Sequence, residues 1–149
     1  MTRLSYKNPS DKLTPLKKIL SHTPNILDAF IKMEEAISEE LSPQLLELTR
    51  LRIATNNECK FCQRLEMFSL SEDKRDFILQ SSKKSVNLSE KEKLSLELVD
   101  QVMSYHGKIS DDLFKGLEGN FTSQEIIALL FQIGHKNAGG WFNIAMLIE

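Results

Sequence analysis

The chain has 149 residues, of which 41% are hydrophobic and 27% are charged, as is usual for a single globular domain. The formal net charge is −2, and basic residues are scattered among acidic ones, which argues against a nucleic-acid partner. No apolar run approaches the roughly 20 residues that span a bilayer, and the polar start lacks the apolar segment of a secretion signal. We therefore expect one domain over residues 1–149, with residues 1–20 as a candidate peripheral arm, in the cytoplasm and without a membrane partner.

Helix starts are marked by a hydroxyl residue followed by proline, in the order that suits an N-cap and the first helical position. This pattern predicts helices after Thr14, Thr23 and Ser42. The third of these helices should end near Asn56 and Asn57, because asparagine tolerates the left-handed conformation.

The remaining segments also have helical patterns. The two cysteines open a segment whose apolar side continues to Leu70. Later helices are predicted over residues 71–80, from Ser89 to Gly107, from Ser110 to Leu117, and from Thr122 or Ser123 to the C-terminus. Because alternating strand patterns are nearly absent, the fold should be an all-α bundle of about six to eight helices.

The last predicted helix is apolar over most of its circumference, so it must be covered on more than one side. Either it is the central helix of the monomer, or another subunit provides part of the cover.

Cys59 and Cys62 are three positions apart, so on a helix they would share one face. If Cys59 lies in a first helical turn, the backbone N–H groups and Lys60 favour a thiolate, whereas Glu58 opposes it. A thioredoxin-type site is not supported, because no βαβ pattern is visible. A tetrahedral zinc site is not supported either, because the three histidines have no ligand spacing. From the motif alone, redox chemistry and a pair of buried structural cysteines both remain open.

The segment before the cysteines has a recognisable pattern. It reads Leu45-Leu46-Glu47-Leu48-Thr49-Arg50-Leu51-Arg52-Ile53-Ala54, followed by Asn57-Glu58-Cys59-Lys60-Phe61-Cys62. This resembles the core of the alkylhydroperoxidase D-like (AhpD-like) and carboxymuconolactone decarboxylase (CMD) superfamily, with Glu47 twelve positions before Cys59. The resemblance continues in the segments 88–93, 121–126 and 135–143, where the last is similar to the family's closing pattern of asparagines.

The resemblance implies an all-α homo-oligomer, a trimer or a multiple of three, and peroxidase chemistry in members that carry the Cys pair. Transferred residue by residue, Cys62 would attack the peroxide, and Cys59 would resolve the product into a Cys59–Cys62 disulfide. Glu47 would begin a proton relay as a general base, although it could instead pair with Arg50 or Arg52. A peroxide substrate and a thiol reductant of unknown identity are implied, with no cofactor and no metal.

One position departs from the family pattern, which places a histidine four residues after the second cysteine. Here that residue is Glu66, which on a helix would face the same way as Cys62. We expect Glu66 either to share a proton with Glu47 in an altered relay or to be a solvated residue with no catalytic role. His135 lies on the last predicted helix, from which it could reach the site; a core or interface position is the simpler interpretation.

Three functions therefore compete. The first is a thiol-dependent peroxidase or disulfide oxidoreductase in antioxidant defence. The second is a carboxymuconolactone-decarboxylase-type lyase, whose pattern depends on histidine rather than on cysteines. The third is a non-enzymatic helical oligomer that binds a small molecule or a partner protein.

Overall fold

The computed structural model describes residues 1–8, 10–80 and 86–149. Within these residues the chain forms eight α-helices and no β-strand, which confirms the all-α fold class. The helices are α1 (Pro15–Leu20), α2 (Pro24–Glu40), α3 (Pro43–Asn56), α4 (Lys60–Arg64), α5 (Glu72–Gln80), α6 (Glu90–Ser104), α7 (Asp111–Asn120) and α8 (Ser123–Ala145).

Most of the predicted helix starts are present. The Thr14 and Ser42 side chains accept a hydrogen bond from a backbone N–H in the first turn of α1 and α3. Ser89 and Thr122 each form a complete capping box at the start of α6 and α8. Thr23 makes no side-chain cap, although Pro24 begins α2 as predicted. These starts depend on contacts within one turn, which explains why the sequence reveals them.

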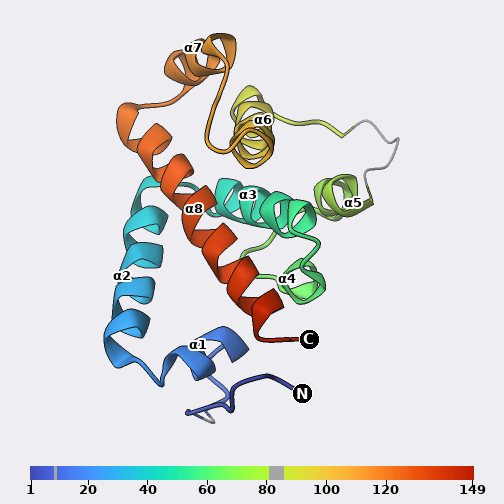
Figure 1. Cartoon of the computed structure of the whole chain (residues 1–149). Helices are drawn as coiled ribbons and strands as arrows, with labels where there is room; N and C mark the ends of the chain where they lie inside the picture. Colours follow the sequence, from blue (N-terminus) through green and yellow to red (C-terminus); the bar gives the residue numbers. More distant parts are fainter. Residues whose placement is uncertain (9, 81–85) are drawn as a thin grey trace.

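The two central helices are α3 and α8, which cross each other, as Figure 1 shows. α2 lies beside α8, and α5 and α6 pack against α3. Leu48, Leu51 and Leu129 are fully buried where these helices meet. α3 also buries three polar side chains, those of Glu47, Thr49 and Arg50. Buried polar groups are normally hydrogen-bonded, so these side chains of α3 need partners inside the molecule.

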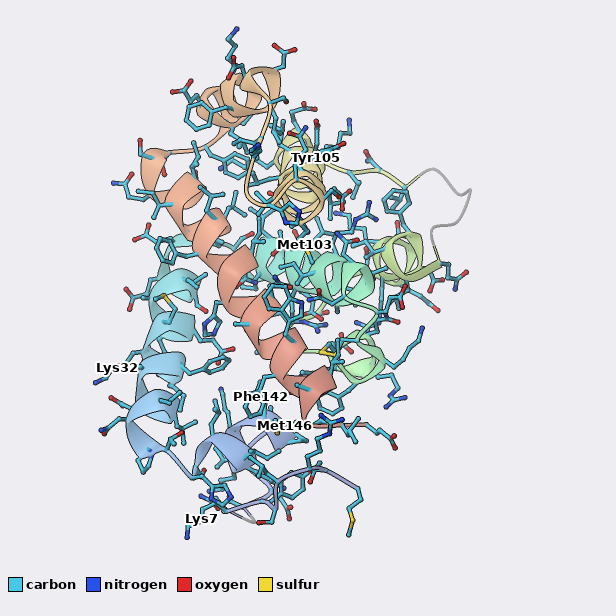
Figure 2. All side chains as sticks on the ribbon, in the orientation of Figure 1. Lys7, Lys32, Met103, Tyr105, Phe142 and Met146 are labelled. Carbon is cyan, nitrogen blue, oxygen red and sulfur yellow. A yellow bond between two sulfur atoms is a disulfide. The ribbon has the colours of Figure 1, made fainter. Side chains whose placement is uncertain are left out.

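The N-terminal residues pack against the end of α8, so that both termini lie at the same end of the molecule (Figure 1). Leu16 and Ile19 of α1 form a small apolar cluster with Ile148. The Arg3 N–H donates to the Met146 carbonyl at 3.0 Å. Figure 2 shows Phe142 and Met146 at this end of α8, next to α1. These contacts support the proposal of one domain over residues 1–149.

The helix ends on either side of the cysteines differ from the prediction. The helix that carries the cysteines ends at Arg64 rather than continuing to Leu70, and Leu65 is extended. At the end of α3 the left-handed residue is Glu58, with φ of 54°, whereas Asn57 stays right-handed. No helix in the described part of the chain is long and apolar enough to cross a membrane.

Candidate functional site

The turn between α3 and α4 positions the two cysteines. After the left-handed Glu58, the Cys59 N–H donates to the Ala54 carbonyl at 3.0 Å. Cys59 is the N-cap of α4 and therefore precedes the first turn in which it was expected. Its sulfur accepts a hydrogen bond from the Cys62 N–H at 3.3 Å.

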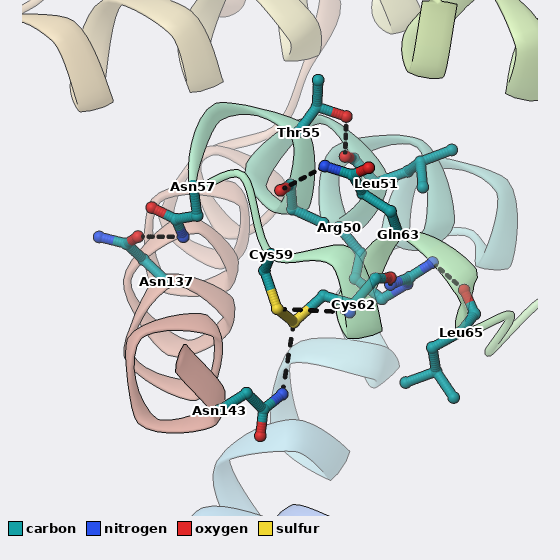
Figure 3. Close-up of a disulfide and its surroundings, with 11 residues drawn as sticks. Arg50, Leu51, Thr55, Asn57, Cys59, Cys62, Gln63, Leu65, Asn137 and Asn143 are labelled. Atoms are coloured by element: carbon teal, nitrogen blue, oxygen red, sulfur yellow. Dashed lines mark hydrogen bonds between the residues drawn. A yellow bond between two sulfur atoms is a disulfide. The ribbon is translucent and has the colours of Figure 1, made fainter. Parts of the chain in front are cut away.

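The two sulfurs are joined in a disulfide, with the Cα atoms 5.2 Å apart. Cys59 is 2% exposed, whereas Cys62 is only partly buried. Figure 3 shows the disulfide between α4 and the last turns of α8. Cys62 is therefore the more exposed of the two cysteines, while protein atoms cover Cys59.

Two asparagines of α8 contact the cysteine turn. The Asn143 amide nitrogen donates to the Cys62 sulfur at 3.3 Å (Figure 3). Near the other end of the turn, the Asn57 amide nitrogen donates to the Asn137 amide oxygen at 2.6 Å. Sequence reasoning gave neither asparagine a role, although both lie in the closing pattern quoted for the family resemblance. The sequence did hold a signal for them, because an amide side chain on a largely apolar helix indicates a buried hydrogen bond.

Glu47 is fully buried, and its carboxylate is paired with Arg50. The Arg50 guanidinium donates to the two Glu47 oxygens at 2.7 and 2.9 Å. It also donates to the Cys62 and Leu65 carbonyls, at 2.6 Å in each case. Arg50 therefore joins the buried carboxylate to the backbone of the cysteine helix and fixes the point at which that helix ends.

The Glu47 carboxylate reaches the cysteine helix through Arg50. Among the described residues, no hydrogen bond joins the Glu47 carboxylate to either sulfur; its connection to Cys62 passes through Arg50. The pairing with Arg50 considered from the sequence is present, but it is buried rather than on the surface. Arg52 instead pairs with Asp100, at 2.6 Å.

The helical position expected for Glu66 is wrong. α4 ends at Arg64, so Glu66 does not lie one helical turn beyond Cys62. Its side chain is exposed. The physical reason is the pair of carbonyls held by Arg50, which turns the chain away from the helical path before Glu66 is reached. Among the described residues, no hydrogen bond joins the Glu66 side chain to Glu47 or to either cysteine.

Cys62 lies in the wall of a pocket of about 80 Å³ that is formed by α1 to α4, α8 and the residues after α4. Apolar side chains make up most of its surface, among them Leu16, Phe30, Phe61, Leu65 and Met67. The polar and charged side chains in the wall include Lys17, Glu34, Arg50, His135, Lys136 and Asn143. A mostly apolar pocket with a few polar groups is the usual form of a small-molecule site.

His135 lies in the wall of this pocket, stacked on Phe30 with the ring centroids 4.1 Å apart. Burial, with a smaller contribution from the Lys136 charge, lowers the pKa of His135 to about 4. The imidazole is therefore neutral near pH 7. Its Nε2 atom is buried and has no hydrogen-bond partner among the described residues. His135 is thus a polar group of the Cys62 pocket rather than only a core residue.

Lys17 and Lys136 share one carboxylate, that of Glu34. The Lys17 ammonium donates to one Glu34 oxygen at 2.8 Å, and the Lys136 ammonium donates to the other. Burial opposes the charged form of Glu34, but Lys136 and Lys17 together lower the pKa of Glu34 below its ordinary value. Burial lowers the pKa of Lys136, and Glu34 only partly offsets that effect. No group of three or more His, Cys, Asp or Glu side chains within the described ranges is arranged to hold a metal ion.

Comparisons with known proteins give a likeness in fold. No family model and no curated protein matches the sequence. A crystal structure from Agrobacterium tumefaciens has the same fold, with a TM-score of 0.76 over 100% of this chain and 97% of that chain, at 23% sequence identity. It is a protein of unknown function, proposed to be the antioxidant defence protein AhpD. At this identity the likeness shows the fold, which agrees with the AhpD-like architecture that the sequence resembles.

Proposed function

We propose that this chain is a thiol-dependent peroxidase or disulfide oxidoreductase of the AhpD-like type, which uses Cys62 and Cys59 as its redox pair. The observation that carries the proposal is the Cys59–Cys62 disulfide, whose Cys62 member lies in the wall of a pocket. A disulfide that small molecules can approach from one side is suited to be broken and re-formed, whereas a structural disulfide needs no such approach.

The proposed reaction has three steps. The Cys62 thiolate attacks the peroxide, which breaks the O–O bond, forms a sulfenic acid and releases an alcohol or water once the leaving oxygen takes a proton. The Cys59 thiol then attacks the sulfenic acid, which forms the disulfide and releases water. Two equivalents of an external thiol reduce the disulfide through a mixed disulfide and are themselves oxidised to a disulfide.

The difference between the two cysteines supports this assignment of roles. Cys62 is partly exposed and receives a hydrogen bond from the Asn143 amide, which favours a thiolate at that sulfur. Cys59 is covered, so it meets a sulfenic acid on Cys62 more readily than it meets an external peroxide. The proposal therefore keeps Cys62 as the attacking residue and Cys59 as the resolving one.

In the same proposal Glu47 is a positioning residue that acts through Arg50. Its carboxylate fixes the guanidinium that holds the Cys62 and Leu65 carbonyls. The exposed Glu66 has no part in this mechanism.

The proposal is tested by counting thiols. Reduced protein, freed of reductant, is titrated under denaturing conditions before and after one equivalent of tert-butyl hydroperoxide. The wild type should lose both thiols, and Cys62→Ser should keep its remaining one. Cys59→Ser should stop at a sulfenic acid that dimedone traps on Cys62. A wild type that retains both thiols would refute the peroxidase function; if it also retains both thiols after incubation with excess oxidised glutathione, the oxidoreductase function is refuted too and the non-enzymatic oligomer becomes the better account.

A second prediction concerns Asn143. Replacing it with Ala removes the hydrogen bond to the Cys62 sulfur, and a bond worth about 1 kcal/mol corresponds to roughly a fivefold change in rate. We therefore expect Asn143→Ala to slow the alkylation of Cys62 by iodoacetamide about fivefold at neutral pH. Asn120→Ala, at an exposed asparagine of α7, is the matched control and should keep the wild-type rate. Equal rates in all three proteins would show that Asn143 does not stabilise the thiolate.

A further inference from the structure

The charges in the wall of the Cys62 pocket do not balance. The Arg50 charge is matched by Glu47, which lies behind it. Lys17 and Lys136, however, are matched only by the single carboxylate of Glu34. With His135 neutral, one positive charge remains without a counter-charge among the described residues that line the pocket.

The excess charge lies in a desolvated place. The side chains of Lys17 and Lys136 are 21% and 14% exposed. Burial, Arg50 and Lys17 all disfavour the charged form of Lys136, and Glu34 alone favours it. Keeping a partly buried cation without a full counter-charge costs free energy. An anion in the pocket would remove that cost.

Two further polar atoms in the pocket wall are unused. His135 Nε2 and the Asn143 amide oxygen are buried and have no hydrogen-bond partner among the described residues. A neutral imidazole that carries its hydrogen on Nε2 can donate to an anionic oxygen. Buried polar atoms of this kind are normally satisfied, and both belong to residues that line the Cys62 pocket. The Asn143 oxygen can only accept a hydrogen bond, so of the two atoms only His135 Nε2 can serve an anion.

The size and walls of the pocket limit the occupant further. A volume of about 80 Å³ exceeds the roughly 10–15 Å³ that a single water needs, so the pocket can admit a small organic molecule. Apolar groups such as Leu16, Phe30 and Phe61 line most of it. The chemistry that fits is therefore a short apolar body with one anionic head.

We propose that the Cys62 pocket binds small organic carboxylates, with the carboxylate at Lys136 and Lys17 and the apolar body against Phe30 and Phe61. This inference rests on the proposed function in one respect. If Cys62 reacts with a small molecule, then that molecule carries a carboxylate. Binding itself requires neither reduced cysteines nor turnover.

Calorimetric titration of the oxidised protein with hexanoate and with hexanamide tests the proposal, since the two probes have the same number of heavy atoms and differ in charge. The wild type should bind hexanoate at least tenfold more tightly than hexanamide. Lys136→Met should lose about tenfold in hexanoate affinity and leave hexanamide affinity unchanged. Lys17→Met should shift hexanoate binding in the same direction and provides a second variant at a more exposed position.

Lys32→Met is the matched control. Lys32 lies on the outer side of α2 (Figure 2) and is not among the residues that line the pocket; its ammonium pairs with Asp28 at 2.8 Å. This variant should bind hexanoate as the wild type does. Equal affinities of the wild type for the two probes, or no heat with either, would overturn the proposal. The calorimetric titration contains no peroxide and therefore tests binding alone. If the protein binds hexanoate but loses no thiols in the peroxide titration, only the peroxidase function is refuted.

Discussion

Asn143 and His135 reach the Cys62 pocket from α8, more than seventy residues along the chain from the cysteines. Asn143 contacts the sulfur itself, and His135 presents a neutral ring to the pocket. The side chains that surround the disulfide thus include groups that the cysteine motif does not contain. The chemistry of the site has to be tested at these residues as well as at the cysteines.

The lowered pKa of His135 predicts a pH-dependent stability. Because the folded pKa of about 4 lies below the ordinary value of 6.5, the unfolded chain binds the proton more tightly. This contribution to the free energy of unfolding is therefore fully present above pH 6.5 and is lost as the pH falls towards 4. The full shift corresponds to about 3 kcal/mol, which partial solvent contact reduces to about 1–2 kcal/mol.

Urea unfolding at pH 7.5 and pH 4.5 measures this effect. His135→Gln should lose about 1–2 kcal/mol less than the wild type between the two pH values. His22→Gln, at an exposed histidine, should show the wild-type pH dependence. If His135→Gln loses as much as the wild type does, the imidazole is not held neutral by its surroundings.

At the scale of elements, α3 and α4 are joined by a buried ion pair that also caps a helix end. Glu47 and Arg50 are both on α3, and Arg50 extends to the carbonyls at the end of α4. Removing one partner of a buried pair leaves the other charge uncompensated. The pair therefore couples the position of the cysteine helix to the stability of the core.

Glu47→Ala should lower the free energy of unfolding by about 3–5 kcal/mol, because Arg50 then remains buried without its carboxylate. Urea denaturation measures the change. Asp28→Ala breaks an exposed pair with Lys32 on α2 and should leave the urea midpoint unchanged. A Glu47→Ala protein as stable as the wild type would show that Arg50 finds other partners and that Glu47 does not position the cysteine helix.

At the scale of the whole molecule, α8 exposes an apolar stripe that runs along its outer face. Ile127, Phe131, Trp141 and Ile144 of this helix are 45% to 61% exposed, while its other face packs against α2 and α3. Both interpretations of the all-round apolar helix therefore have support: it is central to the monomer, and part of it remains uncovered. Exposed apolar surface of this kind marks an interaction site.

We expect this stripe to be an interface between copies of the chain in a trimer or a multiple of three. Light scattering coupled to size-exclusion chromatography should then give a mass of three or more times the 17.1 kDa chain. Replacing both Ile127 and Phe131 with Glu should release monomers, because burying each apolar side chain contributes about 1.5–3 kcal/mol. Lys115→Glu, at an exposed lysine of α7, should leave the mass unchanged. A monomeric wild type would contradict the prediction.

The features that were correct from the sequence are local ones. Helix starts at Thr14, Ser42, Ser89 and Thr122 depend on groups three residues apart. The Cys59–Cys62 disulfide, which the family resemblance implied, is also present. The all-α class follows from periodicity within each helix. Such patterns are complete within a few residues, so they can be read without knowing how the helices pack.

Three features depended on the packing of α4 and α8 against α3. They are the partners of Arg50, the exposure of Glu66, and the position of His135 and Asn143 in the same pocket wall as Cys62. The Arg50 guanidinium, for example, donates to carbonyls twelve and fifteen residues away. Those bonds end α4 before the position at which Glu66 would have faced the thiol. Contacts between residues far apart in the chain form only when the helices meet, and the tertiary structure therefore decided which charged groups surround the disulfide.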